Sequence, residues 1–164
     1  MSRRVSVVRR LLLVALVLVI LGGAIAWKVM ADRPEASTGT VTPADSASFV
    51  LPDSYQPTQE EQAWIDSHTG AAGAYSRKFG DYLFALVTMG EKPTGGFAVE
   101  IAQVGVSGDK WVVDVRFVSP GANDIVIQAF TYPFGYVKIK SDGKSLVIRD
   151  VTGQAPVELT VTEE

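Results

Sequence analysis

The chain has 164 residues, with 15 Lys or Arg against 18 Asp or Glu, and no cysteine. The lack of cysteine excludes disulfides, thiolate metal sites, cysteine nucleophiles and a lipid anchor attached through an N-terminal Cys. Residues 1–31 hold five of the basic residues and none of the acidic ones, which leaves ten against 18 and a net charge of about −8 for the rest. This acidic balance disfavours a nucleic-acid partner.

The N-terminal part has the pattern of a membrane anchor. Residues 11–27 carry no charge and are mainly Leu, Val, Ile, Ala and Gly, and four arginines precede them. As a helix rising about 1.5 Å per residue, this run spans roughly 26 Å, close to the ~30 Å hydrocarbon thickness of a bilayer. We therefore predict a cytoplasmic tail at 1–10, a single transmembrane helix in the plasma membrane from Leu11 to Ala31, and an extracytoplasmic C-terminal part.

A cleavable signal peptide is the alternative, because Ala24, Ile25 and Ala26 form a small-x-small motif after a basic segment. A retained anchor is favoured, because the apolar run is longer than the usual ~7 to 15 residues of a signal peptide and Trp27 is a typical interfacial residue. Cleavage would give a secreted protein. Both alternatives place the C-terminal part outside the cytoplasm.

The rest of the chain divides into a linker and one domain. Small and polar residues predominate just after the apolar run, so we expect a linker at 32–56. The domain is expected at 57–164 and begins with a short helix at about 59–68. Thr58 and Glu61 have the spacing of a capping box at the start of this helix.

The remainder has the pattern of an all-β domain. Gly73 lies in a small-residue segment that we expect to be flexible, and beyond Phe79 apolar residues alternate with polar ones between recurrent turn signals. We predict an antiparallel immunoglobulin-like β-sandwich, with Asp142-Gly143 as a two-residue hairpin turn. The seven expected strands are 82–89, 97–102, 111–117, 125–131, 136–139, 146–150 and 157–161. Residues 82–89 are apolar on both faces, as expected for a central strand.

The second and third of these strands are expected to form a hairpin whose turn is centred on Gly108. Aligning their apolar faces places Val99 opposite Phe117 and Ile101 opposite Val115. The same register places Glu100 opposite Arg116 on the polar face, where an ion pair is expected.

The sequence offers no convincing catalytic or metal-binding group. His68 is the only histidine and ends the expected helix, where it suits the helix dipole better than a catalytic triad. Glu100 and Asp114 share a face as a glycosidase pair would, but Arg116 opposite Glu100 would keep this carboxylate ionised. One histidine and scattered carboxylates make no ligand cluster. We therefore expect no enzyme activity, no metal and no cofactor.

Two loops are distinctive. Residues 90–97 begin like a phosphate-binding loop, but Gly96-Phe97 replaces the required Lys-Ser/Thr and a strand follows. Pro93 and the adjacent glycines fix the path of this loop between two strands. In residues 130–136, four aromatics occupy every second position, and Pro133 indicates an edge or a bulge. Core packing is the favoured explanation of the aromatics, and an exposed recognition surface is the alternative.

Residues 82–83, 90–101, 118–121 and 131–134 together resemble the C-terminal domain of PrcB-type protease complex subunits. The resemblance covers roughly 79–139. It implies a non-enzymatic accessory module at the cell surface that binds and stabilises a protease, often tethered as a lipoprotein. Because this chain has no lipoprotein cysteine, a helical anchor would replace the lipid.

The sequence thus predicts a membrane-anchored module that binds a protein partner, with an exported protease as the partner that the resemblance implies. A fainter similarity to chagasin-type cysteine-protease inhibitors makes inhibition one alternative, and a small-ligand or cell-wall-binding module is another. The residues expected to contact the partner lie in the two distinctive loops. They are Lys92, Pro93, Thr94, Gly95, Gly96, Phe97, Tyr132, Pro133 and Phe134.

Overall fold

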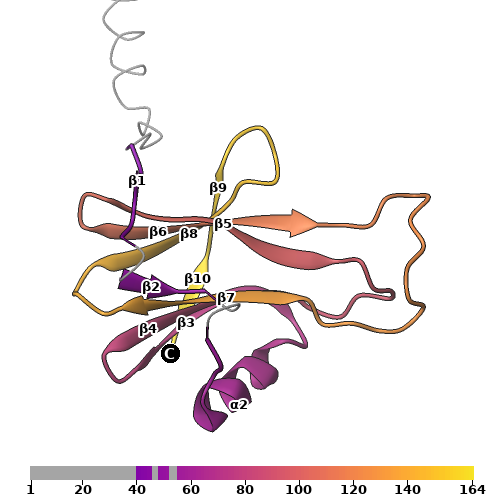
Figure 1. The fold of residues 1–164 in the computed structure, drawn as a ribbon, viewed down its shortest axis with the longest axis horizontal. Coiled ribbons are helices and arrows are strands. Elements are labelled where there is room, and N and C mark those ends of the chain that lie inside the picture. The colour runs from indigo at the N-terminus through magenta and orange to yellow at the C-terminus, as the bar shows by residue number, and fades with distance from the viewer. Residues whose placement is uncertain (1–39, 46–47, 52–54) are drawn as a thin grey trace, which may run out of the picture. The chain divides into compact units, whose positions relative to one another are not determined.

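The computed structural model describes residues 40–45, 48–51 and 55–164 (Figure 1). The expected cytoplasmic tail at 1–10 and membrane span at 11–31 lie outside the described residues. Within the described part, no helix is long and apolar enough to cross a membrane.

The described residues form one helix and ten strands. The helix is α2 (Gln59–His68). The strands are β1 (Thr42–Pro43), β2 (Phe49–Val50), β3 (Ala72–Phe79), β4 (Tyr82–Met89), β5 (Ala98–Ser107), β6 (Lys110–Val118), β7 (Phe134–Lys140), β8 (Ser145–Asp150), β9 (Val157–Leu159) and β10 (Val161–Glu163). They make two five-stranded sheets, β1-β5-β6-β8-β9 and β10-β3-β4-β7-β2, which lie face to face as a sandwich (Figure 1). The predicted β-sandwich with one short helix is confirmed at this level.

The main core fills the space between the two sheets. Trp111, Val113 and Val115 on β6 point inward from the first sheet, as their alternation predicts, and all are almost fully buried. Val87 and Val137 face them from the second sheet.

A second core lies on the outer face of the second sheet, under α2. Phe84 and Leu86 of β4 point to this side and pack with Trp64 and Ile65 of the helix and with Tyr136. The Trp64 and Phe84 rings meet edge to face, with centroids 6.4 Å apart. Strand β4 is therefore buried on both faces, as its continuous apolar sequence predicts.

A buried ion pair joins the start of α2 to the sheet. Thr58 and Glu61 form the predicted capping box, and the same Glu61 carboxylate accepts a hydrogen bond from Tyr55 (2.7 Å) and from the Lys138 ammonium of β7 (3.1 Å). Burial alone would raise the pKa of Glu61, but the hydrogen bonds from Thr58, Tyr55 and Lys138 outweigh it and lower that pKa. The Lys138 ammonium also lies 4.1 Å from the centroid of the Tyr55 ring.

The predicted β5–β6 hairpin is confirmed in its register. Val99 lies opposite Phe117, Ile101 opposite Val115, and Glu100 opposite Arg116. The expected ion pair forms at 3.5 Å on the exposed face. Gly108 in the turn has φ +60°, a conformation that glycine adopts without steric cost.

Two pairings depart from the predicted antiparallel arrangement. Strand β8 lies parallel to β6, and β10 lies parallel to β3. The Asp142-Gly143 turn therefore does not make a hairpin, because it connects β7 in one sheet to β8 in the other. Turn chemistry specifies a local reversal of the chain, whereas the choice of sheet depends on distant partners.

Three further segments differ from their expected structure. Gly73, expected in a flexible segment, lies inside β3 opposite Thr88. Strands β1 and β2 fall within the expected linker at 32–56, and they pair with β5 and β7 respectively. Residues 125–131 are not a strand but part of a loop, in which only Thr131 makes an isolated bridge.

We predict that Glu61→Gln lowers the free energy of unfolding at pH 7 by about 3 kcal/mol, because it leaves the Lys138 ammonium without its carboxylate in a largely buried site. The lowered pKa of Glu61 contributes stability above its unfolded pKa, and this contribution is lost as the pH falls through the folded pKa. The wild type should therefore lose more stability than the variant as the pH falls below about 5. Urea denaturation at several pH values measures both effects.

Glu60→Gln is the matched control. Glu60 is the neighbouring helix residue, and its side chain is 74 % exposed and 3.8 Å from Arg77. Its replacement should change stability by less than about 0.5 kcal/mol. Equal losses for the two variants would contradict the proposed importance of the buried pair.

Candidate functional site

The two distinctive loops lie side by side in the structure. One connects β4 to β5 and contains residues 90–97, and the other connects β6 to β7 and contains residues 119–133. Lys92 and Thr131 form a two-hydrogen-bond bridge between them, with N···O distances of 2.8 and 2.9 Å. The loops extend together beyond one end of the sandwich (Figure 1). We call residues 90–97 and 119–134 together the arm.

Further hydrogen bonds tie the arm together along its length. The Gly95 amide donates to the Ile127 carbonyl at 2.9 Å, and the Thr131 hydroxyl donates to the Thr94 carbonyl at 2.8 Å. The Tyr132 hydroxyl donates to the Glu91 carboxylate at 2.7 Å, and this bond raises the pKa of Tyr132. The arm is therefore a braced double loop.

Gly96 fixes the path of the first loop. Its φ of +84° lies in the left-handed region, and a Cβ at this position would come within 3.0 Å of Pro120 and Val126 of the second loop. Gly95 has no such constraint, since a Cβ there would make an ordinary contact of 3.6 Å with Ile127. The two glycines thus have different roles, which their adjacency in the sequence does not reveal.

The predicted contact residues are all in the arm, but they are not equally accessible. Those that are exposed are Pro93, Gly96, Tyr132 and Phe134, and those that are half-buried are Lys92, Thr94, Gly95, Phe97 and Pro133. The Lys92 ammonium lies 5.8 Å from the centroid of the Phe97 ring, and the Pro133 carbonyl accepts a hydrogen bond from Met89. The half-buried members therefore shape the arm, and the exposed members are available to a partner.

The four aromatics at alternate positions divide in the structure. Tyr136 is buried and stacks on Phe84, with ring centroids 5.5 Å apart, as the core explanation predicts. Phe130, Tyr132 and Phe134 are exposed, so the core explanation is wrong for these three. All three lie in the arm, and Phe134 at its end stacks on Tyr136 with ring centroids 6.5 Å apart.

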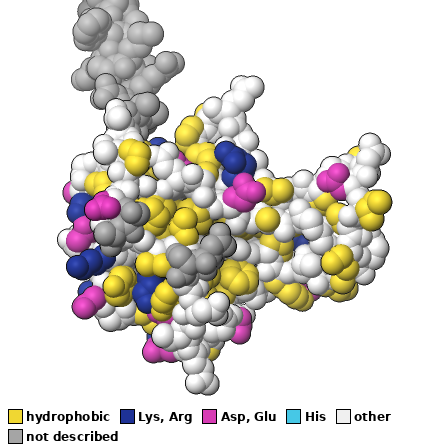
Figure 2. All heavy atoms as spheres, in the orientation of Figure 1, with side chains coloured by type: hydrophobic (Ala, Val, Ile, Leu, Met, Phe, Trp, Pro, Cys, Tyr) yellow, Lys and Arg dark blue, Asp and Glu magenta, His cyan; other side chains and the backbone are white. Residues whose placement is uncertain are grey.

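Sequence reasoning missed the most exposed apolar residues of the arm. Ile125 is fully exposed, and Ile127 and Phe130 are 74 % and 69 % exposed. All three fall within the strand expected at 125–131. The sequence does contain a sign against a half-buried strand here. Residues 125–127 are three consecutive β-branched residues without polar alternation, and they follow the turn-forming pair Asn123-Asp124. Apolar side chains are visible at the end of the molecule where the arm projects (Figure 2).

The other residues considered for chemistry have partners in the structure. His68 faces the Trp64 carbonyl and, at 3.0 Å, the Glu164 carboxylate. Asp114 accepts two hydrogen bonds from Arg149, at 2.7 and 2.9 Å. Among the described residues, no group of three or more His, Asp and Glu side chains is arranged to hold a metal ion.

The arm and the strands that carry it lie within a segment that matches a known family model. Residues 83–140 match the family model described as PrcB C-terminal. This match confirms the resemblance predicted from the sequence. The matched segment runs from β4 to β7 and contains both loops of the arm. No curated protein and no solved structure matches the chain.

We predict that Gly96→Ala destabilises the arm by roughly 1–2 kcal/mol, since an alanine is strained at positive φ and its Cβ would lie too close to Pro120. Hydrogen exchange at the Gly95 amide should accelerate about tenfold or more, because this amide bonds across the arm to Ile127. Gly95→Ala is the matched control and should leave exchange at the Thr131 amide unchanged. Unaltered exchange in Gly96→Ala would show that the arm does not depend on this glycine.

Proposed function

We propose that this protein is a membrane-anchored extracytoplasmic module that binds another protein through the arm and has no catalytic activity of its own. The partner we propose is an exported protease, to which the module is an accessory or stabilising subunit. The observation that carries the proposal is the clustering of exposed apolar side chains. Of the seven large hydrophobic residues exposed in the described part of the chain, five lie in the arm. They are Ile125, Ile127, Phe130, Tyr132 and Phe134.

The physical argument rests on two properties of the arm. Large exposed apolar side chains gathered in one region are typical of interaction surfaces, because they gain most when a partner excludes water from them. The hydrogen bonds that link Lys92 with Thr131 and Gly95 with Ile127 hold the two loops together before binding. A preorganised loop loses less conformational entropy on association.

The family match supports a PrcB-like accessory role, since it covers both loops. The protease partner and the surface location follow from the resemblance and from the apolar N-terminal run, which would take the place of a lipid attached to cysteine. The accessory role is favoured over the chagasin-like alternative because the family match covers both loops of the arm.

We predict that the double variant Ile127→Asp and Phe130→Asp reduces partner binding by at least about a hundredfold, because two charges replace apolar contacts at the centre of the proposed interface. Crosslinking in intact cells, with a photoreactive residue at Gln128, should capture one exported protein in the wild type and lose it in the variant. Thermal unfolding should be unchanged, since both side chains are already exposed.

Val157→Asp provides the matched control. Val157 of β9 is also an exposed apolar residue, at 60 %, but it lies outside the arm. Its replacement should leave the crosslink intact. A crosslink that survives the arm variant, or one that disappears equally in the control, would refute the proposed surface. Capture of a second copy of this chain would identify self-association as the role of the arm.

The proposed location has a separate test. Protease added to intact cells or spheroplasts should degrade an epitope fused after Glu164, and a carbonate wash should leave the full-length chain in the membrane fraction. A shorter product that leaves the membrane on washing would indicate signal cleavage and secretion. An epitope that is protected until the cells are lysed would contradict the extracytoplasmic location.

A further inference from the structure

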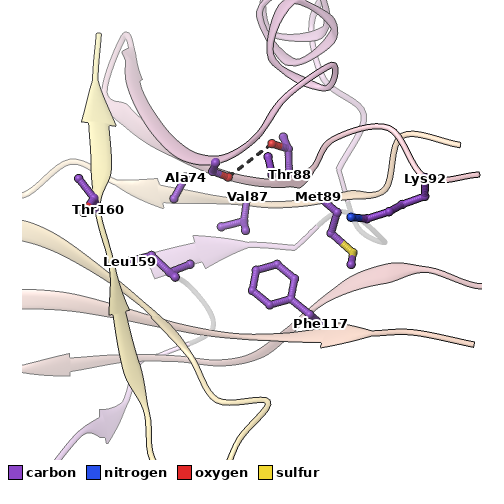
Figure 3. Close-up of a pocket in the computed structure, with 10 residues that line it drawn as sticks. Ala74, Val87, Thr88, Met89, Lys92, Phe117, Leu159 and Thr160 are labelled. Atoms are coloured by element: carbon purple, nitrogen blue, oxygen red, sulfur yellow. Dashed lines mark hydrogen bonds between the residues drawn. The ribbon is translucent and has the colours of Figure 1, made fainter.

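A cleft of about 400 Å³ opens between the two sheets at one side of the sandwich (Figure 3). Its walls are apolar side chains from both sheets. Ala74, Val87 and Met89 line it from β3 and β4, and Phe117 and Leu159 line it from β6 and β9. The volume lies near the lower end of the range for small-molecule sites.

The cleft exists because of the path of the chain at the end of the domain. Strands β9 and β10 are consecutive but belong to opposite sheets, and the chain crosses the gap between them at Thr160. The crossing closes one side of the cleft, as Figure 3 shows for Leu159 and Thr160. Strand β10 pairs with β3 only from Ala74 onward, so the sheets remain open beside Ala72 and Gly73.

Of the residues that the structure describes, one charged residue, Lys92, lines the cleft. The Lys92 side chain runs from the arm toward Met89, which places its ammonium at the cleft margin (Figure 3). Lys92 makes no salt bridge with any carboxylate in the described part of the chain. The neighbouring Glu91 carboxylate accepts a hydrogen bond from the Tyr132 hydroxyl. The ammonium is therefore available to an anionic group on a bound molecule.

Few polar side chains surround the cleft. Among the described residues, Thr88 and Thr160 are the only polar side chains in the lining besides Lys92. The Thr88 hydroxyl already donates to the Ala71 carbonyl at 2.5 Å. A ligand with a hydrocarbon chain and a single anionic head fits this distribution, because only its head needs a polar partner.

We propose that this cleft binds a medium-chain aliphatic carboxylate, with the chain between Val87 and Phe117 and the carboxylate paired with the Lys92 ammonium. The apolar walls remove the hydrocarbon from water, and the ammonium provides a charge-assisted hydrogen bond to the head group. This site does not rest on the proposed function, since it lies between the sheets and uses only Lys92 from the arm.

The test uses the full chain in nanodiscs of zwitterionic lipid, labelled with ¹³C at its methionine methyl groups. The chain has three methionines, of which Met89 lines the cleft, so its methyl signal reports on this site and Met89→Leu assigns it. Titration with octanoate should shift the Met89 signal saturably, with half-saturation below about 1 mM. No shift of this signal up to about 5 mM octanoate would overturn the proposal.

Variants test the roles of the Lys92 charge and of the shape of the cleft. Lys92→Leu should weaken octanoate binding about tenfold and leave octanol binding unchanged, whereas Lys92→Arg should stay within about threefold of the wild type. Lys110→Leu, which removes an exposed lysine at the start of β6, is the matched control and should bind normally. Thr160→Trp should block the cleft from its exposed side.

Two results would count against the aliphatic carboxylate as occupant. The first is equal octanoate affinity in Lys92→Leu and the wild type, which would show that the ammonium does not contribute to binding. The second is tighter binding of a short peptide with a C-terminal leucine than of octanoate, by about tenfold or more, which would identify a polypeptide terminus as the occupant.

Discussion

The burial of β4 on both faces is the constraint on which the rest of the structure depends. Its inward side chains complete the core between the sheets, and its outward side chains, Phe84 and Leu86, form the base on which α2 packs. A strand in this position needs cover on both sides, because an uncovered face would leave large apolar side chains in water. The helix and the first sheet are thus both required by one short stretch of sequence. The Glu61–Lys138 pair then fixes where the helix begins on the sheet.

The same strand also places the arm. Strand β4 ends at Met89, whose amide donates to the Pro133 carbonyl, so the two loops leave the sandwich together. From there the backbone bonds of Lys92 and Gly95 keep them together without a regular sheet. This arrangement presents apolar side chains to solvent from a backbone whose path is fixed. The match to the PrcB C-terminal family spans the strands that produce this geometry.

Local patterns in the sequence predict much of this structure, and distant pairings account for what they miss. The alternation of β5 and β6 predicts their pairing from Val99–Phe117 to Ile101–Val115, because one alignment brings the apolar faces together. A bulge between Ile101 and Gln103, which the alternation does not show, shifts the pairing nearer the turn by one residue. The same reasoning fails for β8, since its sequence does not show that it crosses to the other sheet and runs parallel to β6. It also fails for Ile125 and Ile127, whose β-branched side chains favour a strand although both residues lie in a loop. Both loops of the arm are identifiable from Pro93 and Pro133, but their adjacency depends on the tertiary fold.

The parallel pairing of β10 with β3 has a consequence for how the protein is made. Val161 lies beside Ala74, roughly 87 residues earlier in the chain, so this edge of the second sheet stays open until the last strand has been synthesised. The two hairpins, β3–β4 and β5–β6, have their partners close in sequence and can assemble while the ribosome is still extending the chain. Until β10 arrives, the β3 edge is a template for pairing with another chain, and nascent molecules are most exposed to misassembly during that interval.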